Sequence, residues 1–145
     1  MSYIYRNATN PDKEAIYGLY REVMKGYISR IWGWNEEWQK NDFSSHFNVD
    51  GITLVFKANE LVGYSQVEDK GDLLFMRMLA ILPGHQGKGI GKKLLESFVK
   101  NGNKYYKHLS LEVFKINLQA RELYEKHGFS VVSETENSYV MESHA

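Results

Sequence analysis

The most informative segment of the chain reads Gln86-Gly87-Lys88-Gly89-Ile90-Gly91-Lys92-Lys93. Its three glycines within five residues leave no β-carbon that blocks a close ligand. An apolar run over residues 73–82 precedes the segment, and an amphipathic helical pattern over 89–100 follows it. We therefore expect a buried strand, a glycine loop and a helix whose first N–H groups, with neighbouring lysines, attract a phosphate or pyrophosphate.

This loop differs from the phosphate loops of other nucleotide-binding folds. The loop of nucleoside triphosphatases needs Gly, four residues and then Gly-Lys-Ser/Thr, and neither Lys88 nor Lys92 stands in that context. The dinucleotide fingerprint would place its last glycine at Lys92 or Leu94. A tight strand–helix connection without a ligand remains open on the loop alone.

Two spaced patterns carry a family resemblance. The first is Leu79-x-Ile81-x-Pro83-x-x-Gln86-x-x-Gly89-x-Gly91. The second is Asn117-x-x-Ala120-x-x-Leu123-Tyr124-x-x-x-Gly128-Phe129. Together they resemble the GNAT superfamily of acetyl-CoA-dependent N-acetyltransferases, over residues 79–129.

The resemblance implies a binding site for acetyl-CoA as co-substrate. Strand backbone would hold the pantetheine arm, and loop N–H groups would hold the pyrophosphate. The residues that it assigns to acetyl-CoA are Leu79, Ala80, Ile81, Gln86, Gly87, Lys88, Gly89, Ile90, Gly91, Lys92 and Asn117. Gln86 is the uncharged form of a position that is often arginine in the family, and a plain helix N-cap is the other interpretation of Asn117.

The resemblance also implies direct acyl transfer from acetyl-CoA to an amine. Tyr124 matches the tyrosine that protonates the leaving thiolate in many members, although a core aromatic on an amphipathic helix is the alternative. Residues 73–80 hold no carboxylate, so the general base is left unassigned among Glu68, Asp72 and Glu37. Because the chain has no cysteine, an acyl-cysteine intermediate is excluded and transfer in a ternary complex is expected. The alternative function is a catalytically silent acyl-CoA-binding sensor or interaction module.

Aromatic residues of the N-terminal half are candidates for the acceptor site. The predicted acceptor-site residues are Tyr27, Trp32, Trp34, Trp38 and Glu68. Ring faces suit an apolar or cationic amine. The alternative is that these rings pack the first two helices onto the sheet.

Composition excludes several other classes of protein. The chain has 145 residues, 18 Lys+Arg, 18 Asp+Glu and no cysteine, so disulfides, thiolate zinc sites and iron–sulfur clusters are excluded. Residues 1–72 hold 8 basic and 11 acidic side chains, whereas residues 73–145 hold 10 and 7, which favours the second half for an anionic ligand. We expect no metal, no nucleic-acid partner and no membrane partner. Without a signal-peptide pattern at the N-terminus, a cytoplasmic location is expected. We expect a monomer or a homodimer.

The order of elements predicts one N-acetyltransferase domain over residues 1–145. Strands are expected over 3–8, 51–58, 61–68, 73–82, 108–113, 129–134 and 139–142. Helices are expected from Asn10-Pro11 to about Gly26 or just beyond it, then over 35–47, 89–100 and 117–128. Asn101-Gly102-Asn103 is expected to stop the third helix. The predicted class is an α/β (mixed α+β) GNAT-like fold. Its central sheet is mixed and mostly antiparallel, with helices on both faces and a right-handed parallel βαβ crossover.

Overall fold

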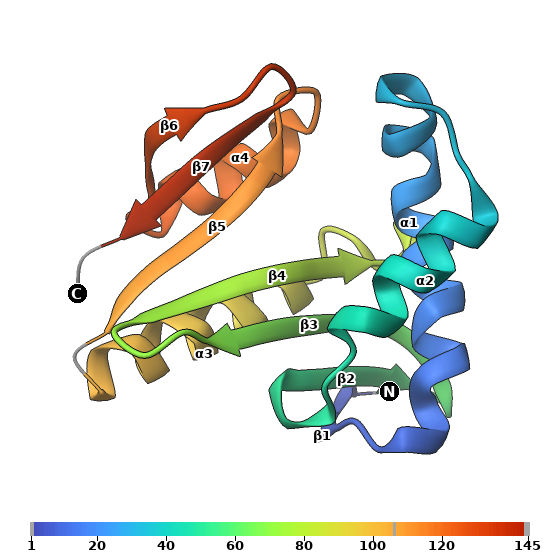
Figure 1. The fold of residues 1–145 in the computed structure, drawn as a ribbon. Coiled ribbons are helices and arrows are strands. Elements are labelled where there is room, and N and C mark those ends of the chain that lie inside the picture. Colours follow the sequence, from blue (N-terminus) through green and yellow to red (C-terminus); the bar gives the residue numbers. More distant parts are fainter. Residues whose placement is uncertain (1, 106, 144–145) are drawn as a thin grey trace.

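The computed structural model of the protein describes residues 2–105 and 107–143. A mixed β-sheet forms the centre of the fold. Within those residues, seven strands lie in the order β1-β2-β3-β4-β5-β7-β6 (Figure 1). The strands are β1 (Ile4–Asn7), β2 (Ile52–Lys57), β3 (Glu60–Asp69), β4 (Leu73–Ile81), β5 (His108–Phe114), β6 (Ser130–Glu134) and β7 (Ser138–Ser143). Only β4 and β5 pair in parallel, which confirms the predicted mixed, mostly antiparallel sheet.

Helices cover both faces of this sheet, as predicted. The α-helices are α1 (Lys13–Ile31), α2 (Glu36–His46), α3 (Ile90–Lys104) and α4 (Leu118–Lys126), and short 3-10 turns occupy Asn10–Asp12, Val49–Gly51 and Pro83–His85. Leu54 of β2 packs in the cluster under α1, whereas its neighbour Val55 packs with Ile90 of α3 on the other face. This alternation places α1 and α2 on one face and α3 and α4 on the other (Figure 1). In the described ranges, the helices are too short or too polar to cross a membrane.

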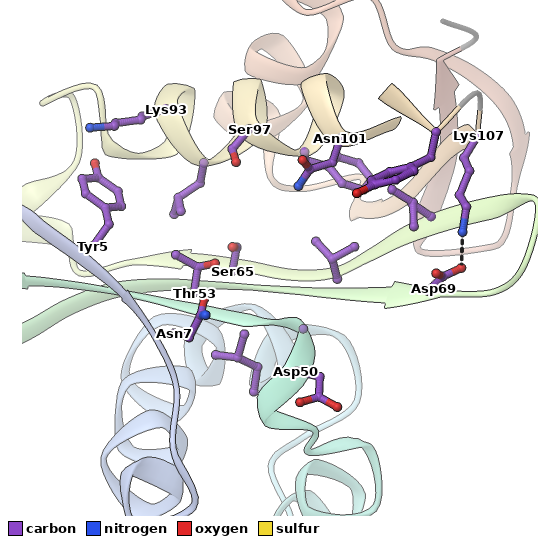
Figure 2. Close-up of a pocket in the computed structure, with 17 residues that line it drawn as sticks. Tyr5, Asn7, Asp50, Thr53, Ser65, Asp69, Lys93, Ser97, Asn101 and Lys107 are labelled. Atoms are coloured by element: carbon purple, nitrogen blue, oxygen red, sulfur yellow. Dashed lines mark hydrogen bonds and ion pairs between the residues drawn. The ribbon is translucent and has the colours of Figure 1, made fainter. Parts of the chain in front are cut away.

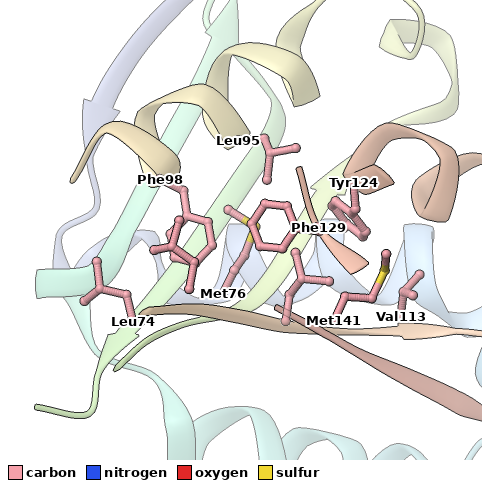
Figure 3. Close-up of a cluster of buried hydrophobic side chains, with 10 residues drawn as sticks. Leu74, Met76, Leu95, Phe98, Val113, Tyr124, Phe129 and Met141 are labelled. Atoms are coloured by element: carbon pink, nitrogen blue, oxygen red, sulfur yellow. The ribbon is translucent and has the colours of Figure 1, made fainter. Parts of the chain in front are cut away.

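The largest hydrophobic cluster fixes α3 and α4 against the second half of the sheet (Figure 3). The rings of Phe98 and Phe129 stack with centroids 6.3 Å apart, and Tyr124 meets Phe129 edge to face at the same distance. Buried Leu95 and Met141 complete the contact between the helices and the strands. The ring of Tyr124 is therefore held by core packing beside the β4–β5 pair.

The third helix continues past its predicted end. Residues 101–103 do not stop α3, which runs to Lys104. The reason is that Gly102 is buried, and a Cβ built there would lie 2.3 Å from Cδ2 of Leu109 on β5. This glycine allows a close approach of helix and strand rather than a helix end. The first helix likewise continues through Gly26 to Ile31.

The parallel strands β4 and β5 pair over only part of their length. Their ladder joins residues 73–76 to residues 108–111. Beyond it, β4 follows β3 to Ile81 and β5 follows β7 to Phe114, so the two strands diverge (Figure 1). A bulge accompanies the divergence, because Met76 and Met78 of β4 face successive residues of β3 and Arg77 is the extra residue. Met76 consequently packs on the α3 face and Met78 on the α1 face.

Candidate active site

A cavity of about 290 Å³ lies between the diverging ends of β4 and β5. It is lined by Met24, residues 75–79 and 112–114, Asn117, Tyr124 and Ser138. Met24 belongs to α1 and Tyr124 to α4, and these helices cover opposite faces of the sheet. The cavity therefore connects the two faces through the gap in the sheet, and we call it the splay cavity.

The backbone of β4 presents polar groups to this gap. Leu82 donates its N–H to the carbonyl of Val62 at 2.9 Å, so this pair is hydrogen-bonded across the antiparallel ladder. Bonded and non-bonded pairs alternate along such a ladder. The N–H and C=O groups of Ala80 thus face β3, and those of Leu79 and Ile81 face the side that β5 leaves. The predicted contacts to a pantetheine arm fit Leu79 and Ile81 by this geometry.

The glycine loop has the geometry of an anion cradle. Gly87 and Gly89 have φ angles of +75° and +86°, and a Cβ built on either meets nothing within 4 Å. Gly89 is the N-cap of α3, and no described side chain caps this helix. The first bond of the helix runs from the N–H of Lys93 to the carbonyl of Gly89 at 3.0 Å. The N–H groups of residues 89–92 therefore lack helical acceptors and fit a pyrophosphate.

The flanking side chains of the loop differ in what they contact. Lys88 and Lys92 are exposed beside the loop. Gln86 instead donates its Nε2–H to the carbonyl of Ile81 at 3.0 Å. In the structure, Gln86 thus joins the loop to the end of β4, and the lysines carry the positive charge.

Asn117 and Tyr124 line the α4 side of the splay cavity. The Oδ1 atom of Asn117 accepts the N–H of Ala120 at 3.2 Å, so the residue is the N-cap of α4. Its Nδ2 group has no hydrogen-bond partner among the described residues and remains available to a ligand. Burial raises the pKa of Tyr124 to about 12. The phenol consequently keeps its proton at neutral pH, as a proton donor requires.

The sequence analysis missed Glu112, a carboxylate that lines the same cavity from β5. Leu111 and Val113 are buried in the α3–α4 cluster, so Glu112 between them points to the opposite face. Its side chain is exposed. The alternation of Leu109, Leu111 and Val113 was a signal for this orientation, but the sequence does not show that β5 diverges from β4 beside Glu112.

The carboxylates that the sequence suggested as bases have other surroundings. Glu68 of β3 forms an ion pair with Arg77, whose NH2 group donates to Oε1 at 3.2 Å. Lys70 adds a second cation at 3.5 Å. Burial alone would raise the pKa of Glu68, but these cations lower it overall. Arg77 lines the splay cavity, whereas Glu68 is outside the described residues that line it. Asp72 and Glu37 are exposed and lie outside the set that lines this cavity.

The predicted acceptor aromatics separate into two places. Tyr27 and Trp32 both contact the ring of Phe114, with centroids 6.3 and 5.7 Å away, and Phe114 lines the splay cavity. Trp38 lies on α2, is 59% exposed and is outside the described residues that line the cavity. The structure therefore places Tyr27 and Trp32 against Phe114, next to the residues that line the cavity, and leaves Trp38 apart.

Trp34 belongs to the contact between α1 and α2. Its ring lies 6.2 Å from that of Tyr20, and its Nε1–H donates to Glu36 at 3.3 Å. Hydrogen bonds from Tyr17, then Arg21, lower the pKa of Glu36 to about 2. The contacts of Trp34 therefore fit the alternative interpretation, in which the ring packs the first two helices together.

A second, larger groove of about 600 Å³ lies between α3 and the first strands (Figure 2). Ser97 and Asn101 of α3 face Thr53 and Ser65 across it, as Figure 2 shows. The residues predicted for acetyl-CoA and for the acceptor all lie outside its described lining. The smaller splay cavity is therefore the candidate active site.

This fold and site define a class of protein. A parallel pair that diverges within a mostly antiparallel sheet, followed by an uncapped glycine turn at a helix N-terminus, matches the expected acetyltransferase fold. The model of the acetyltransferase (GNAT) family matches residues 14–129. The chain therefore belongs to the GNAT family, which confirms the resemblance drawn from the two motifs.

Relatives and solved structures agree with this assignment. The chain is 38% identical over 86 residues to a ribosomal protein bS18-alanine N-acetyltransferase of Haemophilus influenzae, covering 59% of this chain and 58% of that protein. It is 27% identical over 85 residues to a spermine/spermidine N(1)-acetyltransferase of Bacillus subtilis, covering 52% and 56%. The chain thus spans a little over half the length of these relatives. A crystal structure of PaiA N-acetyltransferase from Thermoplasma acidophilum in complex with coenzyme A covers 100% of both chains, with a TM-score of 0.81 and 22% identity. At 22% identity, this similarity shows a shared fold alone.

Proposed function

We propose that this protein transfers the acetyl group of acetyl-CoA to an amine by direct attack in a ternary complex. The observation that carries the proposal is the splay cavity, which joins Tyr124 on one face of the sheet to Glu112 on the other. The uncapped N-terminus of α3 adds an anion site at the end of β4. The named activities of the relatives, acetylation of a protein alanine and of polyamines, support the reaction class.

Residues of this chain fit two parts of acetyl-CoA, the pyrophosphate and the pantetheine arm. The open space at Gly87 and Gly89 and the N–H groups of residues 89–92 would hold the pyrophosphate, with Lys88 and Lys92 beside it. The backbone of Leu79 and Ile81 and the Nδ2 group of Asn117 would hold the pantetheine arm. Bound acetyl-CoA would supply the acetyl group as a thioester, whose C–S bond breaks as the C–N bond of the product forms.

Two side chains of the splay cavity have the properties needed to move protons. Glu112 is an exposed carboxylate on the α1 side, where it would accept a proton from the acceptor nitrogen, directly or through water. Tyr124 is a buried phenol that holds its proton at neutral pH and would donate it to the departing sulfur. Asn117 would orient the arm between them.

The alternative function, a silent acyl-CoA-binding module, rested on the missing carboxylate in residues 73–80. Glu112 on β5 removes that reason, because a carboxylate lines the cavity after all. We keep the silent module as an outcome of the experiment below.

The test is coenzyme A release from acetyl-CoA in the presence of amines, measured with a thiol reagent. The panel holds spermidine, 2-phenylethylamine and a peptide with an N-terminal alanine. Tyr124→Phe and Glu112→Gln should each lower kcat by about 100-fold, within the usual range for general acid–base catalysis, and leave acetyl-CoA affinity unchanged. Tyr105→Phe at the C-cap of α3 and Glu122→Gln on α4 alter exposed residues and serve as matched controls with wild-type kcat. Calorimetric binding of acetyl-CoA without release on any amine would favour the silent module.

We further propose that residues 1–145 act as one acetyltransferase domain in the cytoplasm, as a monomer or homodimer, without nucleic-acid or membrane partners. The single sheet through the described residues and the family match over residues 14–129 support one domain. The absence of cysteine suits a reducing compartment, and the equal numbers of basic and acidic side chains do not favour a polyanionic partner.

A further inference from the structure

We infer that the acceptor of this enzyme is a small monoamine that carries an aromatic group, in preference to a polyamine or a peptide N-terminus. This inference rests on the proposed acetyltransferase function and names the substrate class of its site. It is carried by an aromatic surface at the acceptor side of the splay cavity and by the charges of that cavity.

Three rings form this surface, which we call the aromatic lip: Tyr27 and Trp32 from the end of α1, and Phe114 from β5. Phe114 lines the splay cavity, and the other two rings contact it with centroids 6.3 and 5.7 Å away. Met24, one helical turn before Tyr27, lines the cavity as well. The aromatic lip thus continues the wall of the cavity outward from β5 to the end of α1.

The outer part of the aromatic lip is exposed although it is strongly apolar. Trp32 is the C-cap of α1, and 64% of its surface is accessible to solvent. Its edge-to-face contact with Phe114 leaves most of the indole uncovered. A ligand ring that covers this surface removes it from water and adds ring–ring contact. The binding free energy of such a ligand becomes more favourable with the apolar area that it buries against these rings.

The charges of the splay cavity suit one amine rather than several. Among the described residues that line it, Glu112 is the one carboxylate and Arg77 the one cation. Two other acidic side chains already have cationic partners. Glu134 of β6 lies 3.3 Å from Lys115, which follows β5, and Glu125 of α4 lies 3.5 Å from Arg121.

A polyamine carries several separated positive charges, and each needs a carboxylate to replace its hydration. Glu112 supplies one such group, and the neighbouring Arg77 already pairs with Glu68. The described lining therefore offers no second carboxylate to the remaining cations of a polyamine. A monoamine places its single nitrogen at Glu112 and its ring on the aromatic lip. A peptide N-terminus without an aromatic first residue would leave Trp32 uncovered.

The experiment compares kcat/KM for 2-phenylethylamine, spermidine and an alanine-led peptide at saturating acetyl-CoA. The variants are Trp32→Ala, Trp32→Phe and, as matched control, Trp38→Ala, since Trp38 is 59% exposed but, unlike Trp32, makes no ring contact with Phe114 among the described residues. The wild type should prefer 2-phenylethylamine at least tenfold. Trp32→Ala should lower kcat/KM for 2-phenylethylamine about tenfold by raising KM, a change equal to about 1.4 kcal/mol. Trp32→Phe should restore most of it, and Trp38→Ala should change it less than twofold.

The outcomes separate this inference from the proposed function. Coenzyme A release that is faster with spermidine or the peptide would overturn the substrate class and leave the acetyltransferase intact. Equal effects of Trp32→Ala and Trp38→Ala would overturn the role of the aromatic lip. No release with any amine would overturn the proposed function and the inference with it.

Discussion

Gly89 offers a quantitative test of the anion cradle because the chain contains a matched glycine elsewhere. Gly89 has a φ of +86°, and Gly71 in the turn between β3 and β4 has a φ of +92°. A Cβ built on either glycine meets nothing within 4 Å. The substitutions Gly89→Ala and Gly71→Ala therefore introduce the same left-handed strain without a steric clash in the protein.

The two variants should lose similar stability and differ in binding. An alanine in the left-handed region costs about 1–2 kcal/mol, so both should unfold at temperatures lower by roughly 3–8 °C. In Gly89→Ala the new methyl group also occupies the open side of the cradle. Losing one charge-assisted hydrogen bond to the pyrophosphate costs about 1.5–3 kcal/mol, which weakens acetyl-CoA binding by about 10- to 150-fold.

Isothermal titration calorimetry with acetyl-CoA measures this difference, and a thermal melt of each variant supplies the stability control. Gly71→Ala should bind acetyl-CoA with wild-type affinity. If Gly89→Ala and Gly71→Ala bind it equally well, the pyrophosphate does not lie on this loop and the reasoning from the glycines is refuted.

Two further predictions concern the fold. Gly102→Ala should lower the free energy of unfolding by about 1–3 kcal/mol, because its Cβ would overlap a leucine of β5 at 2.3 Å, whereas Gly26→Ala in open space on α1 should raise it by about 0.5–1 kcal/mol. Urea denaturation measures both, and equal effects would contradict the close packing at Gly102. The pKa of Glu36 is lowered from 4.5 to about 2 in the folded protein, so its stabilising contribution is present above the ordinary value and is lost as the pH falls. The stability difference between wild type and Glu36→Gln should therefore narrow between about pH 5 and pH 2, and a pH-independent difference would argue against these hydrogen bonds.

Local sequence signals predicted the elements whose causes are local. The glycine loop was predictable because glycine recurs at alternate positions 87, 89 and 91, and two of these, Gly87 and Gly89, have positive φ. The α4 N-cap was predictable because Asn117 accepts a hydrogen bond from a backbone N–H only three residues ahead. The buried run of β4 and the alternation of β5 likewise reflect periods of the chain itself. These signals were enough to predict the mixed sheet and the helix–strand order.

The features that the sequence analysis missed depend on partners far along the chain. Gly102 resembled a helix stop, but its role is set by contact with Leu109 across the helix–strand interface. The bulge at Arg77 exists because β3 pairs with residues on both sides of it. Glu112 became a candidate base only when the divergence of β4 and β5 opened a cavity next to it. Spacing within one segment does not encode these relations.

The aromatic residues illustrate the same limit. Tyr27, Trp32, Trp34 and Trp38 are close in sequence and were grouped as one acceptor site. Their rings instead point to different neighbours, two toward Phe114, one toward Tyr20 and one toward solvent. Helical geometry points residues that are only a few positions apart in different directions. The density of aromatic residues therefore predicted the segment that approaches the cavity, but not which of its rings do so.

A crystal structure of the protein with coenzyme A tests the central claim most directly, because the molecule offers two cavities of different size. We expect the pyrophosphate on the N–H groups of residues 89–92 and the pantetheine arm between β4 and β5. The sulfur should then lie beside the hydroxyl of Tyr124, with Glu112 across the cavity. Coenzyme A bound in the larger groove between α3 and the first strands would contradict it.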